Sequence, residues 1–187
     1  GEKVRQLIEE HVYSTGVDPK IAPIDLLSGD FQDKVDEHKT DRAKASEIEY
    51  AIKHHIKINV EEDPEYYKTL SDRLKDIIQK NEDKWDDLVQ LLMDFRENIE
   101  EDRKRGAEEV GLSLTEKAFY NILISKFNNP LGDNSLDDAA KLRVIEVVKQ
   151  LVNMMEEATS IVGFFDGKWD EQKRVKKKIK RTILDEE

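Results

Sequence analysis

Residues 45–71 read ASEIEYAIKHHIKINVEEDPEYYKTLS, and this stretch decides the fold. Its first half has an isoleucine or valine at every fourth position, which predicts an amphipathic helix over residues 40–60. The apolar stripe of this helix is Ile48, Ile52, Ile56 and Val60. Asp63 and Pro64 then predict the start of a second helix, because aspartate accepts a first-turn N–H and proline fits the first helical position.

The rest of the chain repeats this helical pattern in segments separated by polar residues, glycine or proline. Alternation of apolar and polar residues at period two is missing, so strands are poorly supported. The further predicted helices cover residues 2–13, 31–39, 64–78, 85–99 and 113–127, a long segment that starts at Asp133 or Ser135, and 169–184. We therefore predict an all-α fold, an irregular bundle of about seven helices with no sheet. One domain over residues 1–187 is expected, and two lobes, 1–103 and 111–187, are the alternative.

Local motifs refine the helix ends. Ser113 followed by Glu116 has the form of a capping box, which predicts that a helix begins there. Residues 21–29 contain proline and several apolar side chains, and we expect an ordered loop that packs on the helices. Residues 100–109 are nearly all charged, and we expect a solvated extension or a mobile link there. Residues 128–134 are a loop by composition.

Two tryptophans and one histidine pair are expected to have structural roles. Trp85 and Trp169 each head a predicted helix, and we expect both indoles to lie in the core. His54 and His55 are adjacent, so on a helix they point about 100° apart and cannot share a metal ion. We expect one histidine to border the core and make a structural hydrogen bond, while the other lies near solvent.

Composition limits the class of protein. Hydrophobic residues make up 37% of the chain and charged residues 39%, which suits amphipathic helices with wide solvated faces. Cysteine is absent, which favours a reducing cytoplasm, and no apolar run approaches the roughly 20 residues that span a bilayer. The chain starts at Gly1 without methionine or a signal-peptide pattern. We expect a fragment of a larger cytoplasmic protein with no membrane contact.

Charge is distributed unevenly along this acidic chain. The net charge is −11, yet seven of the nine residues from Lys173 to Arg181 are basic, which leaves about −18 for the rest. Val175, Ile179 and Ile183 form one apolar stripe that docks this last helix. The outward candidates for a partner or DNA contact are Lys176, Lys177, Lys180 and Arg181. They suit nucleic-acid phosphates, an acidic protein surface, or a solvated face that balances the negative charge elsewhere.

Three segments resemble, in order, the C-terminal helical region of the R (motor and nuclease) subunit of type I restriction–modification enzymes. The first spans residues 45–78 and contains SEIEYAIKHHI and EEDPEYYKTLSDRL. The second spans 111–127, with a glycine-leucine pair at its start and Ala118-Phe119-Tyr120 inside it. The third spans 164–184 and contains Trp169 and the basic helix. Residues 99–109 and 128–135 match nothing in the family pattern.

The resemblance implies a non-catalytic piece of an ATP-dependent type I site-specific deoxyribonuclease. Its implied partners are the methyltransferase (M) and specificity (S) subunits, the rest of its own R subunit, and DNA through the complex. It implies that this region docks the motor and nuclease subunit on the methyltransferase–specificity core. The whole subunit would use ATP and magnesium, whereas we expect no cofactor in this fragment. The alternative is a helical DNA-binding module that uses the same basic helix.

A nuclease site within the chain is the third hypothesis. Asp25 followed by Glu37-His38-Lys39 superficially matches the acidic-residue-then-Glu-x-Lys pattern of many restriction nucleases. That chemistry needs carboxylates on adjacent strands to hold a divalent metal, and this segment is predicted to be helical. No glycine-rich loop precedes a Gly-Lys-Ser/Thr, and no serine has an evident histidine and aspartate arrangement. We therefore predict no catalytic, cofactor-binding or metal-binding residue here.

Overall fold

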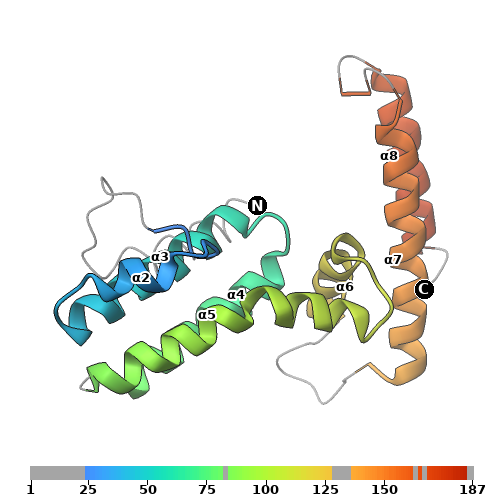
Figure 1. Ribbon diagram of the computed structural model, residues 1–187. Coiled ribbons are helices and arrows are strands. Elements are labelled where there is room, and N and C mark those ends of the chain that lie inside the picture. Colours follow the sequence, from blue (N-terminus) through green and yellow to red (C-terminus); the bar gives the residue numbers. More distant parts are fainter. Residues whose placement is uncertain (1–23, 82–83, 128–135, 162–163, 166–167, 185–187) are drawn as a thin grey trace. The chain divides into compact units, whose positions relative to one another are not determined.

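The computed structural model describes residues 24–81, 84–127, 136–161, 164–165 and 168–184 (Figure 1). Within these residues the chain forms seven helices and no strand, which confirms the predicted all-α class. The helix predicted over residues 2–13 and the loop predicted over 128–134 lie outside the described residues. The chain divides into two compact units, residues 1–105 and 106–187, which are described separately below.

The described part of the first unit contains four helices around one apolar core. They are α2 (Phe31–Asp36), α3 (Asp41–Asn59), α4 (Pro64–Lys80) and most of α5 (Trp85–Glu108). The isoleucine stripe of residues 45–60 points into this core, together with Tyr67, Leu70 and Leu74 from α4. Trp85 packs against the same core, as predicted.

Side-chain caps fix where the two decisive helices begin. The Thr40 hydroxyl accepts a hydrogen bond from the Ala43 N–H at 3.2 Å and starts α3. The Asp63 carboxylate accepts from the Tyr66 N–H at 3.1 Å and starts α4, with Pro64 at the first helical position. Both caps satisfy backbone donors that a helix start leaves without a partner.

The described part of the predicted ordered loop, residues 24–29, packs on the helices as expected. Leu26 is buried in the core, and Arg96 of α5 holds the loop by its carbonyl groups. The guanidinium donates from Nε to Leu26 O at 2.7 Å and from Nη2 to Ser28 O at 3.1 Å. It also stacks over the Phe31 ring, 4.6 Å from its centroid. One arginine therefore joins the loop and the start of α2 to α5.

Of the two predictions for residues 100–109, the mobile link is wrong, and the solvated extension of the helix holds for the half of its side chains that are exposed. α5 continues as a regular helix to Glu108, and two side chains of this stretch are buried, Arg103 and Ala107. They follow Ile99 at steps of four residues, so they extend the apolar stripe of the helix. The charged composition conceals this stripe, because an arginine occupies one of its positions.

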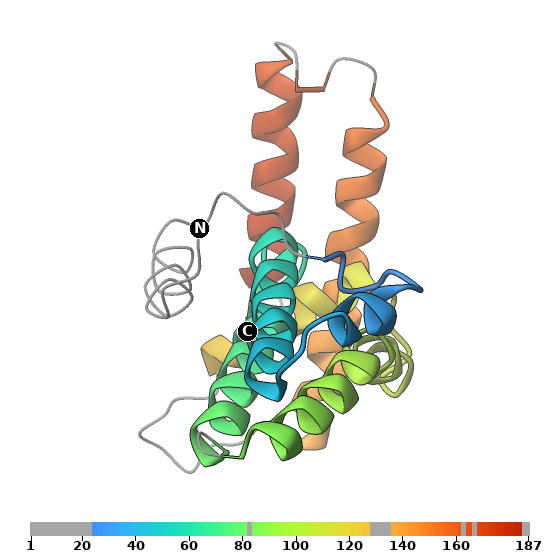
Figure 2. The same ribbon diagram turned by 60° about the vertical axis from the view of Figure 1, so that its left-hand side comes forward.

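The second unit contains α6 (Leu114–Phe127), α7 (Asp138–Thr159) and α8 (Trp169–Leu184). Its cores are two small clusters on two faces of α7. One packs α6 and Leu112 against Val148 and Val152, and the other packs Ile179 of α8 against Val147, Leu151 and Met154. α7 and α8 run side by side as an antiparallel hairpin in both Figure 1 and Figure 2.

The capping box predicted at the start of α6 is confirmed. The Glu116 N–H donates to Ser113 Oγ at 3.3 Å, and the Ser113 N–H donates to Glu116 Oε2 at 2.7 Å. The predicted start of the next helix at Asp133 or Ser135 is wrong. α7 begins at Asp138, because the Asp137 carboxylate caps it by accepting from the Ala140 N–H at 2.7 Å.

The expectation that Trp169 lies in the core is also wrong, since 68% of its surface is exposed. Helix geometry supplies the reason. At 100° per residue, Trp169 lies about 120° from Val175 and about 80° from Ile179, so it is to one side of the two described side chains that face α7. Its apolar character suggested the core, but the indole lies beside the stripe and is exposed.

A glycine in the left-handed conformation ends α5. Gly111 has φ +64°, its N–H donates to Glu108 O at 3.0 Å, and the Leu112 N–H donates to Ala107 O at 3.0 Å. This is a Schellman motif, in which the last carbonyls of the helix find donors. Leu112 and Ala107 are both buried, which supplies the apolar contact that usually accompanies the motif.

Two glycines in this region should respond oppositely to alanine. A Cβ would meet no atom within 4 Å at Gly106 or at Gly111, so only the backbone conformation decides. We expect Gly111→Ala to lower the free energy of unfolding by about 1 kcal/mol, the cost of a left-handed residue with a side chain. We expect Gly106→Ala, inside α5, to raise it by about 0.4–1 kcal/mol. Denaturant unfolding followed by circular dichroism measures both, and equal signs would contradict the assignment.

Candidate functional site

α8 presents a basic surface because its apolar stripe is engaged by α7. Val175 and Ile179 are half-buried, and Ile179 packs on the α7 cluster. The side chain of Ile183, the third predicted member of the stripe, lies outside the described part of the chain. All seven basic side chains between residues 173 and 181 are exposed.

The four predicted contact residues lie on one side of α8. Lys176, Lys177, Lys180 and Arg181 are spaced by one, three and one residues, so they lie within one half of the helix, beginning at the edge of the stripe that faces α7. Among the described residues none of the four forms an ion pair, whereas Arg174 pairs with Glu171 at 3.0 Å. The four cations are therefore available to carboxylates or phosphates on another molecule.

Sequence reasoning missed that Trp169 lies on this same side. Trp169, Lys173, Lys176 and Lys180 are separated by four, three and four residues, which is the spacing of one continuous helical stripe. All four side chains are exposed. The helical spacing in the sequence already places Trp169 in line with these lysines. The prediction instead relied on the hydropathy of tryptophan. We call these four residues, with Lys177 and Arg181 beside them, the outer face of α8.

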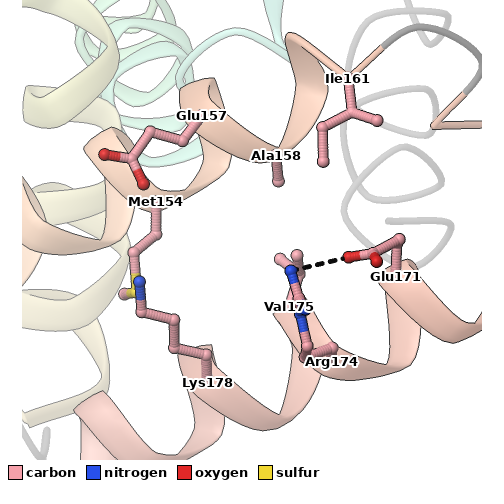
Figure 3. A pocket seen from close by; sticks show the side chains of 8 residues that line it. All are labelled: Met154, Glu157, Ala158, Ile161, Glu171, Arg174, Val175 and Lys178. Atoms are coloured by element: carbon pink, nitrogen blue, oxygen red, sulfur yellow. Dashed lines mark ion pairs between the residues drawn. The ribbon is translucent and has the colours of Figure 1, made fainter.

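A shallow groove lies where α7 and α8 meet (Figure 3). Its floor is apolar, from Met154, Ala158, Ile161 and Val175, and its rim carries charged side chains, among them the Glu171–Arg174 pair. The groove has a volume of about 160 Å³. Pockets that hold small molecules usually enclose about 300–1,000 Å³, so this groove is a feature of helix packing and not a ligand site.

A second concentration of polar groups is buried in the first unit. His55 of α3 and Arg103 of α5 flank the fully buried Tyr67 of α4. Arg103 Nη1 lies 2.9 Å from Glu62 Oε2 and donates to the Tyr67 hydroxyl at 3.3 Å, while its guanidinium stacks over the Tyr67 ring at 5.4 Å. The His55 ring tilts against Tyr67 with centroids 5.9 Å apart. This cluster joins three helices through one aromatic ring.

The protonation states in this cluster favour a structural role. Burial lowers the pKa of His55, and it outweighs Glu100, whose Oε1 lies 3.4 Å from Nε2 and raises the pKa. The charges of Arg103 and Asp25 act on His55 in opposite directions, lowering and raising its pKa. Burial also raises the pKa of Tyr67 to about 12, so its hydroxyl stays protonated.

The histidine pair behaves as predicted from the sequence. His55 is buried, and the Asn59 side-chain amide lies 3.2 Å from its Nδ1 and donates to its carbonyl oxygen at 2.9 Å. His54 is exposed. Adjacent positions on α3 therefore hold one core histidine and one solvated histidine, which provides a matched pair for mutation.

Stability should fall on mild acidification because of His55. Its pKa is lower in the folded chain than the ordinary value near 6.5, so the unfolded chain takes up a proton first as the pH falls. The free energy of unfolding then decreases below about pH 6.5, by at most about 1.4 kcal/mol per pH unit, until the pH passes the folded-state pKa. We expect His55→Gln to remove this slope between pH 7 and 5, and His54→Gln to retain it. Urea titrations at each pH measure both, and equal slopes in the two variants would refute the role of His55.

The nuclease hypothesis finds no metal-binding geometry in the described structure. No group of three or more histidine, cysteine, aspartate or glutamate side chains is placed to hold a metal ion there. Glu37 follows the short helix α2, and Asp25 lies in the loop before it, where its carboxylate accepts from the Leu27 N–H at 3.0 Å. The adjacent strands that this chemistry requires are also missing from the described residues.

Residues 1–185 match the family described as type I restriction enzyme HindI endonuclease subunit-like, C-terminal. A curated relative from Methanocaldococcus jannaschii, named "Putative type I restriction enzyme MjaIXP endonuclease subunit", is 28% identical over 131 residues. The match covers 68% of this chain and 11% of the relative. No solved structure matches, and none of the described helices is long and apolar enough to cross a membrane.

Proposed function

The chain belongs to the family of C-terminal regions of type I restriction enzyme endonuclease subunits, and we propose that it is the non-catalytic docking domain of such a subunit. In this proposal it joins the motor and nuclease parts of its subunit to the methyltransferase–specificity core. ATP and magnesium belong to the rest of the subunit, and the complex works in the cytoplasm. DNA is then reached through the assembled complex.

One observation carries the proposal: Lys176, Lys177, Lys180 and Arg181 are exposed, and they form no ion pair with another described residue. Seven of the nine residues 173–181 of α8 are basic, in a chain whose net charge is −11. A folded domain gains little from such a cluster by itself, because like charges on one helix repel each other. An acidic surface on a partner relieves this repulsion and guides the partner into register. We therefore assign the methyltransferase–specificity core as the partner of Lys176, Lys177, Lys180 and Arg181.

A helical DNA-binding module is the second candidate, and the same cations favour it. Lysine and arginine neutralise backbone phosphates, and each neutralised phosphate adds nearly one unit to the slope of log affinity against log salt concentration. The acidic remainder of the chain, about −18 by subtraction of the seven basic charges, repels a polyanion and ranks this candidate below protein docking.

A paired binding experiment separates the two candidates. The 187-residue chain is immobilised and exposed to the methyltransferase–specificity core encoded beside its gene, and to labelled duplex DNA in a parallel assay. Binding to the core without appreciable DNA affinity is the expected result. Salt-sensitive DNA binding without core binding would replace the docking assignment with the second candidate. Absence of both would reject a contact with either partner.

A further inference from the structure

The most exposed large apolar side chains of the described structure gather at the end of the α7–α8 hairpin. Phe165 and Trp169 are 75% and 68% exposed. Single exposed apolar residues are ordinary on a protein surface, but Trp169 also belongs to the lysine stripe of the outer face of α8. An indole in line with lysines combines an apolar contact with electrostatic attraction on one surface.

Hydrogen bonds join Phe164 to the end of α7 and to the first turn of α8. The Gln172 side-chain amide donates to Phe164 O at 2.6 Å, and the Phe164 N–H donates to Ile161 O at 3.0 Å. Phe164 is buried, and its ring meets the Phe165 ring edge to face with centroids 5.1 Å apart. Trp169 is the first residue of α8, so the helix fixes its backbone. A residue whose backbone is already ordered loses less entropy on binding.

We propose that Trp169 is the apolar anchor of the docking interface, and that it inserts into a hydrophobic pocket with an acidic rim on the methyltransferase–specificity core. This inference rests on the proposed function and names the residue that carries most of its affinity. Tryptophan is the residue most typical of such anchors, which usually lie in desolvated pockets surrounded by weaker contacts. Lys173, Lys176 and Lys180 continue from the indole along α8 and meet the acidic rim.

The surroundings of Trp169 fit a protein pocket better than nucleic acid. Binding to single strands needs cations interleaved with the aromatic rings, so that phosphates are neutralised where bases stack. The two residues that follow Trp169 are acidic, Asp170 and Glu171, and the basic run starts only at Lys173. The positive charge therefore lies to one side of the indole, as it would beside a pocket whose carboxylates lie along one rim.

The indole and the lysines should affect different rate constants of binding. Charges that surround an interface act mainly on the association rate and on its salt dependence. A desolvated anchor acts mainly on the dissociation rate, where most differences in affinity arise. Trp169→Ala should therefore accelerate dissociation and leave the salt dependence of association unchanged.

The test measures the kinetics of core binding to the 187-residue chain by surface plasmon resonance. We expect Trp169→Ala to weaken binding by about 30-fold or more, through faster dissociation. The matched control is Leu142→Ala, which truncates another exposed apolar side chain of the same unit and should change nothing. Circular dichroism verifies that both variants remain helical.

A second measurement observes Trp169 without removing it. Trp85→Phe leaves Trp169 as the only tryptophan of the chain, and 5-fluorotryptophan then gives one fluorine resonance. We expect this resonance to shift when the core is added. Core binding that leaves the resonance unmoved, or that survives Trp169→Ala unchanged, overturns the anchor and leaves the docking function intact. If the core does not bind and duplex DNA moves the resonance, both the docking function and the anchor are overturned.

Discussion

Replacing Tyr67 by alanine should lower the free energy of unfolding of the first unit by about 3–5 kcal/mol, the usual cost of removing a buried aromatic side chain. Tyr67 is fully buried. Its ring packs edge to face on Tyr66 with centroids 5.2 Å apart, and it also contacts His55 and Arg103. The substitution leaves a cavity where α3, α4 and α5 meet, and the Arg103 guanidinium loses its aromatic support.

Tyr67→Phe separates the ring from the hydroxyl. It removes the acceptor of the 3.3 Å hydrogen bond from Arg103 but keeps the packing and leaves the ion pair with Glu62. We expect a loss of about 1–2 kcal/mol, since a buried donor loses one of its partners. If Tyr67→Ala costs no more than Tyr67→Phe, the ring does not organise the core.

Urea unfolding of a Trp169→Phe chain measures both variants. The only remaining tryptophan is then Trp85, which packs on the core of the first unit, so its emission reports on that unit. Circular dichroism reports on the helices of the whole chain. The emission transition should move to lower urea concentration in both variants, and further in Tyr67→Ala.

Reversing the charge of Lys176, Lys177, Lys180 and Arg181 to glutamate should slow association with the methyltransferase–specificity core by about 10- to 1,000-fold, the range that electrostatic steering covers. Each substitution changes the charge by two, so the net charge goes from −11 to −19, and the outer face of α8 becomes negative. Because the four side chains are exposed, the helix should keep its packing on α7.

The matched control is a variant with the same change in net charge at positions outside α8. It reverses four exposed lysines outside α8 to glutamate: Lys68, Lys75, Lys104 and Lys149. We expect its association rate to stay much closer to that of the natural chain at physiological ionic strength, where charges further apart than about 8 Å are largely screened. Stopped-flow or surface plasmon resonance measurements at several salt concentrations give the comparison. Equal effects of the two quadruple variants would mean that net charge, and not the outer face, governs association.

These two predictions concern different units and different forces. The Tyr67 variants change packing and hydrogen bonding in the first unit, whereas the charge reversals on α8 change the surface of the second. Each experiment can therefore serve as a negative control for the other. The Tyr67 variants should not alter α8, and the quadruple variant of α8 should not move the unfolding transition that Trp85 reports.

Much of the architecture follows from the sequence alone. The stripe at residues 45–60, the cap at Asp63 with Pro64, and the capping box at Ser113 and Glu116 each dictate a local helical geometry. Local hydrogen bonds and a 3.6-residue period require no knowledge of the rest of the fold. The bounds of α8 and the exposure of its four predicted cations follow for the same reason.

The tertiary structure decided what distant residues do to each other. Residues 100–109 look solvated in the sequence, yet α5 buries Arg103 there because Glu62 and Tyr67, about 40 positions earlier, supply an ion pair, a hydrogen bond and a ring. Trp169 looks like a core residue, yet α7 engages a different side of α8 and leaves the indole in solvent. Periodicity fixes which side chains share a face of a helix, but only packing determines which face meets a neighbour and which remains free to bind.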